Sequence, residues 1–223
     1  MSRKRTVSIV FDDIYEETCN AINKECSFIK LKYSSKKDGR LDSANLESKF
    51  LSDLQGSFKK NYPSFDFEIP KNRHWYDVKI NNIPINLKIT SGGRDNAFNK
   101  VSILYTICGE EIDKKHMNFN SWWDEIEKCN KKDVRDKKSE YHYLVVDKNS
   151  SNIMFKSILD ISEYHTNPCN ILQIDWKNEF NNINYSIKDK DFKKKINILL
   201  KTIQTSVKQD VESKMKLVNA KIK

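Results

Sequence analysis

A short alternating segment, residues 74–90, constrains the fold of this chain more than any other part of the sequence. At its centre stands Asn81-Asn82, and asparagine tolerates the positive φ angles that a tight two-residue turn requires. Apolar and polar side chains alternate on both sides of this turn, as they do in strands whose two faces meet different environments. The segment therefore predicts an antiparallel β-hairpin closed by Ile80 and Ile83.

The turn also predicts which side chains share a face of the hairpin. Outward from the closing pair, the expected partners are Lys79/Pro84, Val78/Ile85 and Asp77/Asn86. The missing N–H of Pro84 is not needed, because its pair is one that exchanges no backbone hydrogen bonds. One face is apolar throughout and consists of Val78, Ile80, Ile83, Ile85, Leu87 and Ile89. The other face carries Asp77, Lys79, Asn86, Lys88 and Thr90.

Two interpretations of the polar face are open. A hairpin with one apolar and one polar face is what any half-exposed antiparallel sheet looks like. Alternatively, the face brings the carboxylate of Asp77, the amide oxygen of Asn86 and the ammonium of Lys88 together on a rigid scaffold. Asp77 and Asn86, the third pair beyond the closing pair, would be a non-hydrogen-bonded pair, the type in which side chains approach most closely.

These residue types suit the hydrolysis of a phosphodiester. That reaction uses a divalent metal, a positioned water and a cation near the phosphate. Because Mg²⁺ prefers oxygen ligands and retains several waters, Asp77, Asn86 and the backbone carbonyl of Leu87 would suffice to hold it. Lys88 would orient the attacking water, shift its pKa or neutralise charge on phosphorus.

Asp77 followed by Asn86-Leu87-Lys88 on a hairpin resembles the motif of the PD-(D/E)XK nuclease superfamily, with Asn in the second acidic position. Some type II restriction endonucleases carry that variant. The resemblance includes a preceding helix with a Glu, here Glu47, which in the superfamily often helps to hold water at the metal. It also includes the loop after Thr90, which in such enzymes approaches DNA and which precedes Asn99 and Lys100.

The resemblance implies a type II site-specific deoxyribonuclease that cuts double-stranded DNA with Mg²⁺ as cofactor. Such an enzyme acts as a homodimer on a palindromic site and is paired functionally with a DNA methyltransferase. The catalytic residues would be Asp77, Asn86, Lys88 and Glu47. The expected DNA contacts are Ser91, Arg94, Asn96, Asn99 and Lys100.

The rest of the pattern predicts an α/β fold in which a central mixed β-sheet is flanked by helices, as in restriction endonucleases. Helices are expected at residues 7–28, 42–60, 97–108 and 122–129, and a long amphipathic one at about 189–219. Strands beyond the hairpin are expected at residues 65–69, 141–147, 152–158 and 171–176, the middle two buried on both faces. A polar loop is expected at residues 91–96. We expect one nuclease domain over residues 1–223, with a catalytic core at about 42–109 and the remainder completing the sheet and supplying recognition and dimerisation elements.

Composition points to an anionic partner. The net charge is +9 over 223 residues, and such a balance favours nucleic acid over membrane. Abundant Lys and Asn are also what an AT-rich genome produces, so this explanation of the charge stays open. Five cysteines without a C-x-x-C pair predict free buried thiols in a reducing cytosol rather than a disulfide framework or zinc site. Without a signal-peptide pattern or a long apolar run, we expect a cytoplasmic protein with no membrane partner.

Other catalytic classes find little support in the sequence. The four histidines lack metal-ligand spacing, and Gly92-Gly93 is not followed by the Lys-Ser/Thr of a phosphate-binding loop. No local signature surrounds a serine or cysteine nucleophile. The alternative to a nuclease is therefore a non-catalytic DNA-binding protein on a degenerate nuclease fold, in which Asn86 records the loss of the metal.

Overall fold

The computed structural model describes residues 3–30, 39–71, 74–109, 118–130, 140–186 and 191–221. The chain divides into two compact units, and each is described by itself. The first comprises Met1–Ser91 and Lys100–Ile158, and the second comprises Gly92–Asn99 and Leu159–Lys223. That residues 1–223 form a single nuclease domain stays a prediction.

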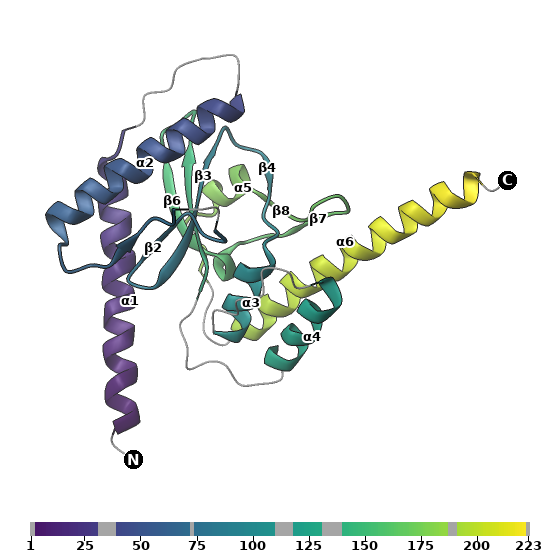
Figure 1. Ribbon diagram of the computed structural model, residues 1–223, viewed down its shortest axis with the longest axis horizontal. Helices are drawn as coiled ribbons and strands as arrows, with labels where there is room; N and C mark the ends of the chain where they lie inside the picture. The colour runs from purple at the N-terminus through teal and green to yellow at the C-terminus, as the bar shows by residue number, and fades with distance from the viewer. Residues whose placement is uncertain are drawn as a thin grey trace. The chain divides into compact units, whose positions relative to one another are not determined.

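The first unit contains a five-stranded sheet with strand order β1-β2-β3-β5-β6 (Figure 1). Strands β3 and β5 run parallel while the other neighbours run antiparallel, so the predicted mixed sheet flanked by helices is confirmed. The strands are β1 (Phe67–Glu68), β2 (Val78–Ile80), β3 (Ile83–Thr90), β5 (His142–Asp147) and β6 (Ile153–Ser157). The helices are α1 (Arg3–Phe28), α2 (Gly39–Asn61), α3 (Lys100–Cys108) and α4 (Phe119–Asn130).

The predicted hairpin is β2 and β3. Its closing pair is Ile80 with Ile83, and the pairs outward are Lys79/Pro84 and Val78/Ile85, as the turn chemistry requires. Asn81 and Asn82 have φ of 44° and 66°, the left-handed values of a tight hairpin turn. The expected Asp77/Asn86 pair is wrong, because the ladder ends one residue earlier, at Val78.

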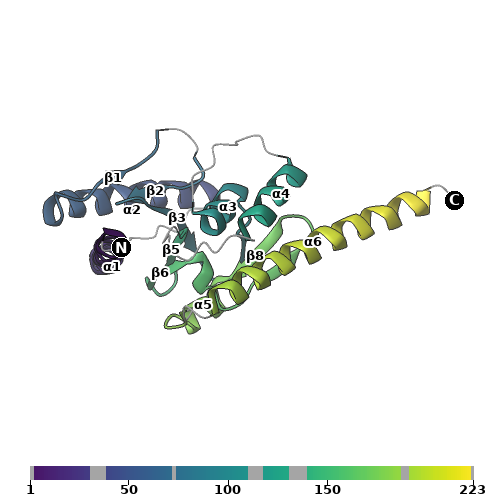
Figure 2. The ribbon, with the colours of Figure 1, turned by 90° about the horizontal axis from the view of Figure 1, so that it is seen from below.

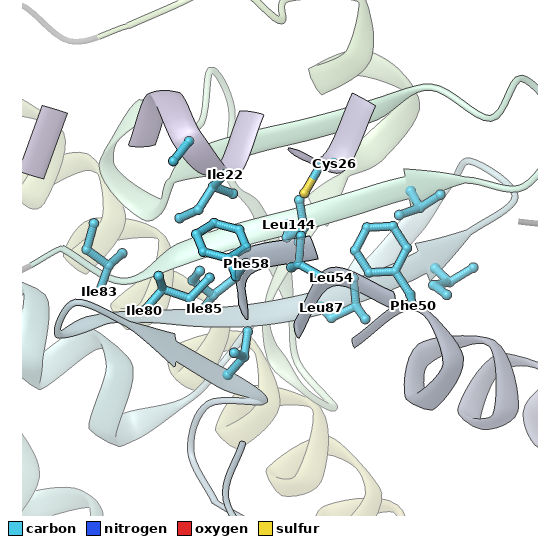
Figure 3. Close-up of a cluster of buried hydrophobic side chains, with 14 residues drawn as sticks. Ile22, Cys26, Phe50, Leu54, Phe58, Ile80, Ile83, Ile85, Leu87 and Leu144 are labelled. Atoms are coloured by element: carbon cyan, nitrogen blue, oxygen red, sulfur yellow. The ribbon is translucent and has the colours of Figure 1, made fainter. Parts of the chain in front are cut away.

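The apolar face of the hairpin lies under helices α1 and α2. All six predicted residues of that face are buried, and they join one cluster with side chains from both helices and from β5 (Figure 3). Phe50, Leu54 and Phe58 supply the α2 stripe expected from their i, i+4 spacing, and none is more than 1% exposed. Each such side chain stabilises the fold by about 1.5–3 kcal/mol through burial.

Polar contacts also hold the two helices and the hairpin together. The buried carboxylate of Glu25 in α1 accepts hydrogen bonds from the side chains of Ser57 and Asn61 in α2. The side-chain amide of Asn81 donates to Thr18 of α1 at 2.9 Å. The turn residue that shapes the hairpin therefore also anchors it beneath α1.

The second unit contains a three-stranded sheet of order β4-β8-β7 and a long C-terminal helix. Its elements are β4 (Arg94–Asn96), β7 (His165–Asn167), β8 (Ile171–Asp175), α5 (Trp176–Asn181) and α6 (Phe192–Lys221), with a 3-10 turn η1 (Ile158–Asp160) where the chain passes from one unit to the other. The loop expected at residues 91–96 is thus partly a strand, and β7 and α5 had no sequence signal strong enough to predict them. Arg94 pairs with Asp175 along β4 and β8 in register.

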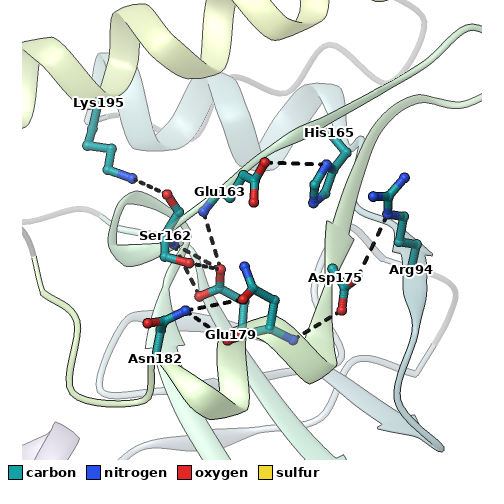
Figure 4. Close-up of polar contacts among 9 residues, drawn as sticks. Arg94, Ser162, Glu163, His165, Asp175, Glu179, Asn182 and Lys195 are labelled. Carbon is teal, nitrogen blue, oxygen red and sulfur yellow. Dashed lines mark hydrogen bonds and ion pairs between the residues drawn. The ribbon is translucent and has the colours of Figure 1, made fainter.

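Two charged side chains, Glu179 and Lys195, form hydrogen bonds with the chain near the start of the second unit (Figure 4). Glu179 of α5 is fully buried and accepts hydrogen bonds from the backbone and hydroxyl of Ser162. Lys195 of α6 donates to the backbone carbonyls of Ile161 and Ser162. The backbone around Ser162 therefore donates hydrogen bonds to the Glu179 carboxylate and accepts them from the Lys195 ammonium. Buried charged groups need such partners.

The predicted apolar stripe of α6 is only partly buried. Its first half packs against β7 and β8 through Ile196, Leu199 and Ile203. Further along, Val211 and Val218 continue the apolar spacing of the helix but are 53% and 49% exposed. Figure 2 shows this half of the helix extending beyond the two strands it packs against, a placement with which Figure 1 agrees.

One prediction about cysteine is also wrong. Cys108 at the end of α3 and Cys129 near the end of α4 are joined by a disulfide, with their Cα atoms 5.2 Å apart. Cys19, Cys26 and Cys169 are free thiols, but only Cys26 is buried. The pair could not be read from spacing, because packing of α3 against α4 brings it together. No helix in the described ranges is long and apolar enough to cross a membrane.

Because His142 is buried at the start of β5, we expect the folded protein to lose stability in mild acid. Its Nδ1 faces the carbonyl of Glu140 and so carries the hydrogen, leaving Nε2 to accept from the Tyr15 hydroxyl at 2.8 Å. Burial lowers the pKa of His142 from 6.5 to about 4. Between these two pKa values the imidazole is protonated in the unfolded chain but neutral in the folded chain, so acid favours unfolding. About 3 kcal/mol of stability should therefore be lost as pH falls from about 6.5 towards 4.

Urea unfolding at a series of pH values measures this loss. Carboxylates titrate in the same range, so the wild-type protein is compared with a His142→Gln variant. The variant should be less stable at pH 7 and should show a pH dependence flatter by about 3 kcal/mol over that interval. Parallel curves for the two proteins would contradict the assignment of the loss to His142.

Candidate active site

Asp77 lies immediately before β2 and is held by two backbone contacts to β3. Its N–H donates to the carbonyl of Ile85 at 2.9 Å, and its carboxylate Oδ2 accepts from the N–H of Leu87 at 2.8 Å. These contacts replace the regular ladder pair expected with Asn86. The carboxylate therefore takes the place of a strand partner at this edge of β3.

The same contacts place a second oxygen at that edge. In an extended strand, the N–H and C=O of one residue point to the same side. Because the Leu87 N–H points to Asp77, the Leu87 carbonyl points to the edge occupied by the Asp77 carboxylate. The predicted backbone ligand and the predicted carboxylate ligand thus share one edge of β3, beyond the end of β2.

Asn86 and Lys88 lie on the face of β3 opposite the apolar cluster, and both are half-buried. The amide oxygen of Asn86, Oδ1, is buried and has no hydrogen-bond partner among the residues that the structure describes. An unsatisfied buried oxygen costs free energy, and an amide oxygen is a ligand of the kind that Mg²⁺ accepts.

The charges of the site influence one another. Burial raises the pKa of Asp77, and the Leu87 N–H and Lys88 oppose that rise. Burial also raises the pKa of Glu47 in α2, with repulsion from Asp77 adding to it and attraction from Lys88 and Lys148 opposing it. Glu47, Asp77 and Lys88 are therefore close enough to influence one another electrostatically, and their roles in catalysis stay a prediction.

Burial is the main cause of both raised pKa values, and repulsion from Asp77 adds to the rise for Glu47. A divalent cation between the two carboxylates would remove their repulsion and favour their ionised forms. Within the described residues, no group of three His, Cys, Asp or Glu side chains is placed to hold a metal. A cation here would therefore depend on amide and backbone oxygens beside Asp77, a donor set of the kind Mg²⁺ accepts.

The predicted DNA contacts fall in both units. In the first unit, the carbonyl of Ser91 accepts from Asn149 at 2.8 Å, and that of Lys100 accepts from the Trp122 indole at 2.8 Å. In the second, Arg94 lies 3.8 Å from Asp175 with its side chain 55% exposed. There, Asn96 accepts from Gln173, and Asn99 is half-buried. Their contact with DNA stays a prediction.

Two residues of the site were missed at the level of sequence. Lys148 follows β5 directly, and its N–H donates to the carbonyl of Thr90 at 2.7 Å, which places it next to the end of β3. Tyr141 precedes β5, and burial raises its pKa well above the ordinary value, with the nearby Tyr143 and Asp77 adding to the rise. Only the parallel pairing of β3 with β5 brings them here. A lysine that directly follows a buried strand is the one signal that could have pointed to Lys148.

Comparison of this chain with protein-family models, with curated proteins and with solved structures finds no match.

Proposed function

We propose that this protein is a Mg²⁺-dependent endonuclease of the PD-(D/E)XK type that cuts double-stranded DNA at a specific short sequence. In this proposal it acts as a homodimer, with one active site for each DNA strand, alongside a DNA methyltransferase that protects the host sites. The fold would be the restriction-endonuclease-like variety of the mixed α/β architecture.

The unpartnered oxygen of Asn86 is the observation that carries the proposal. It lies in a site with a backbone-anchored carboxylate, Asp77, and a lysine two residues along the same strand. A purely structural polar face would satisfy that oxygen with a donor, since most buried polar atoms are hydrogen-bonded. A cation bound by Asp77, Asn86 and the Leu87 carbonyl would satisfy it instead.

Each residue then has a role in hydrolysis. When bound, Mg²⁺ supplies positive charge to the scissile phosphate and makes water more acidic. Lys88 orients the attacking water and stabilises the negative charge that develops on the phosphate oxygens. Glu47, whose pKa is raised by burial and by Asp77, is suited to accept the proton that the water loses as its oxygen bonds to phosphorus. The phosphorus–oxygen bond to the leaving strand breaks in the same displacement.

Cleavage of unmethylated plasmid DNA with and without Mg²⁺ tests the proposal. Discrete fragments that require Mg²⁺ would support a site-specific enzyme. A smear would support a nuclease without sequence specificity. EDTA should stop cleavage, and excess Mg²⁺ should restore it.

The alternative is a DNA-binding protein without catalysis. It is favoured by one observation, the lack of a third acidic or histidine ligand among the described residues near Asp77. Both candidates bind DNA, so binding does not separate them. DNA binding without any Mg²⁺-dependent cleavage, over a panel of plasmids and phage DNAs, would favour this alternative.

Salt dependence is a prediction that both candidates share. A basic dimer that contacts several phosphates should lose affinity steeply with salt, with a slope of about −0.9 in log K against log salt for each neutralised phosphate. Removing one phosphate contact should reduce the slope by about one for each half-site. We expect this for Arg94→Ala and Lys100→Ala, measured by fluorescence anisotropy on a DNA duplex.

Lys128→Ala provides the matched control for these two variants. Lys128 is an exposed lysine of α4 that pairs with Glu125 at 3.1 Å, and its removal should leave the slope unchanged. A flat salt dependence of the wild-type protein would instead mean that its charge of +9 does not serve DNA binding.

A further inference from the structure

An apolar ridge runs along α6 and continues past the part of the helix that is packed within the second unit. It consists of Leu199, Ile203, Val207, Val211 and Met215, which follow one another at i, i+4 and so lie in one row on the helix surface. The first two side chains are fully buried, the third is half-buried, and the last two are 53% and 54% exposed. The ridge therefore remains apolar where its cover within the unit ends.

The exposed part of the ridge is a surface that a partner would stabilise. Val218 lies at i+7 from Val211, on the same side of the helix, and is itself 49% exposed. Packing of the apolar face supplies most of the stability of a helix in a protein, and contiguous exposed apolar side chains mark interaction surfaces. A suitable partner offers an apolar row of similar length.

The charges beside the ridge suit a second copy of the same helix. Lys208 and Glu212 lie along one flank, 3.9 Å apart, and Asp210 and Lys214 lie along the other, 2.6 Å apart. The first pair is centred on residue 210 and the second on residue 212, so both are nearly symmetric about Val211. When the helix pairs with a copy that runs the opposite way, each flank meets the same flank of that copy with acid and lysine in reverse order. Opposite charges then come together on both flanks.

We propose that the exposed ridge of α6 binds the same ridge of a second copy of this chain, with the two helices antiparallel and crossing at Val211. Such a contact is symmetric and closed: Val211 faces Val211, and Val207 faces Met215 of the second copy. A parallel pair would bring both second units, which cover the ridge as far as Ile203, to the same end of the crossing. The antiparallel pair sets them at opposite ends. The inference supplies an interface for the homodimer of the proposed function, and it rests on that function for the role of the dimer on DNA.

Sedimentation velocity of the whole protein without DNA, from about 1 µM to about 100 µM, tests the interface. The wild-type protein should be dimeric at the upper concentration. Val211→Glu sets two like charges face to face and should raise the Kd of the dimer at least ~10-fold. Leu217→Glu is the matched control, because Leu217 is 62% exposed on the same helix but lies off the ridge, and its Kd should change by less than about twofold. Equal losses in the two variants would overturn the proposal.

A mixture of two further variants tests the antiparallel crossing. Val207→Glu and Met215→Lys should each weaken the dimer, since each sets a charge against an apolar side chain of the second copy. Mixed in equal amounts, they should form a heterodimer in which the new carboxylate of one copy faces the new ammonium of the other. A parallel pair would not bring these positions together, so a mixture that stays monomeric overturns the proposal. Should Val211→Glu fail to fold, the mixture decides alone.

The same measurements separate this inference from the proposed function. A wild-type protein that is monomeric at about 100 µM overturns the α6 interface, even where it cuts plasmid DNA into discrete fragments. A dimer whose Kd is unchanged by Val211→Glu overturns it as well, because the copies then meet elsewhere. A dimer that Val211→Glu dissociates, in a protein that cuts no DNA with Mg²⁺, supports the interface and overturns only the nuclease.

Discussion

Lys88→Ala should slow Mg²⁺-dependent DNA cleavage by at least ~10²-fold, the usual cost of removing a positioned electrostatic or acid–base group. The fold should survive, because the side chain is half-buried on the polar face of β3 and takes no part in the apolar cluster. DNA binding should also persist, since one cation among many contributes little to affinity. The cleavage rate under single-turnover conditions, together with anisotropy for binding, measures both effects.

Lys79→Ala is the matched control for this experiment. Lys79 lies on the polar face of the same hairpin, on β2, and pairs with Glu68 at 3.1 Å. Its loss removes an equal charge from the same scaffold and should change the cleavage rate by less than a few-fold. If the two variants cut at similar rates, the effect is one of general charge, and Lys88 has no special role at the phosphate.

The hairpin could be predicted in detail because its determinants are local. The two asparagines fix the turn, the turn fixes the register, and alternation assigns every side chain to a face. The structure agrees with the register from Val78 to Ile85. It departs at Asp77, where the carboxylate caps the Leu87 N–H. Nothing in the residue pattern distinguishes such a side-chain cap from one more ladder pair.

The site depends also on contacts between segments far apart in the chain. Glu47 comes from α2, thirty residues before Asp77, and its place near Asp77 was expected only because the motif resembles one whose preceding helix carries a Glu. Tyr141 and Lys148 come from the two ends of β5. The sequence predicts that strand but not its neighbour, because a parallel partner is chosen by packing of the whole sheet.

Short elements and helix contacts account for the remaining differences. Strands β4 and β7 have three residues each, too few for an alternating pattern to stand out from a loop. The Cys108–Cys129 disulfide follows from packing of α3 against α4. The exposed end of α6 has the same apolar spacing as its buried start, so spacing alone could not show where packing stops.

Asn86 is the position at which the chain departs from the usual acid pair, and two substitutions there should behave in opposite ways. Asn86→Leu keeps the approximate size but removes the amide oxygen. It should raise the Mg²⁺ concentration for half-maximal cleavage at least ~10-fold, since a ligand of the cation is lost. A Leu variant that cuts normally at limiting Mg²⁺ would show that Asn86 is no ligand.

Asn86→Asp adds a carboxylate to a site in which burial already raises the pKa values of Asp77 and Glu47. Without metal, the added repulsion should raise at least one of these pKa values further and lower the free energy of unfolding. With Mg²⁺ the same charge attracts the cation, so cleavage should be retained at an equal or lower Mg²⁺ requirement. Urea unfolding with EDTA and with Mg²⁺ measures the effect of the added carboxylate on the free energy of unfolding. The variant should be less stable than the wild-type protein in EDTA, and it should gain more stability than the wild-type protein when Mg²⁺ is added. Equal gains in the two proteins would place the cation away from residue 86.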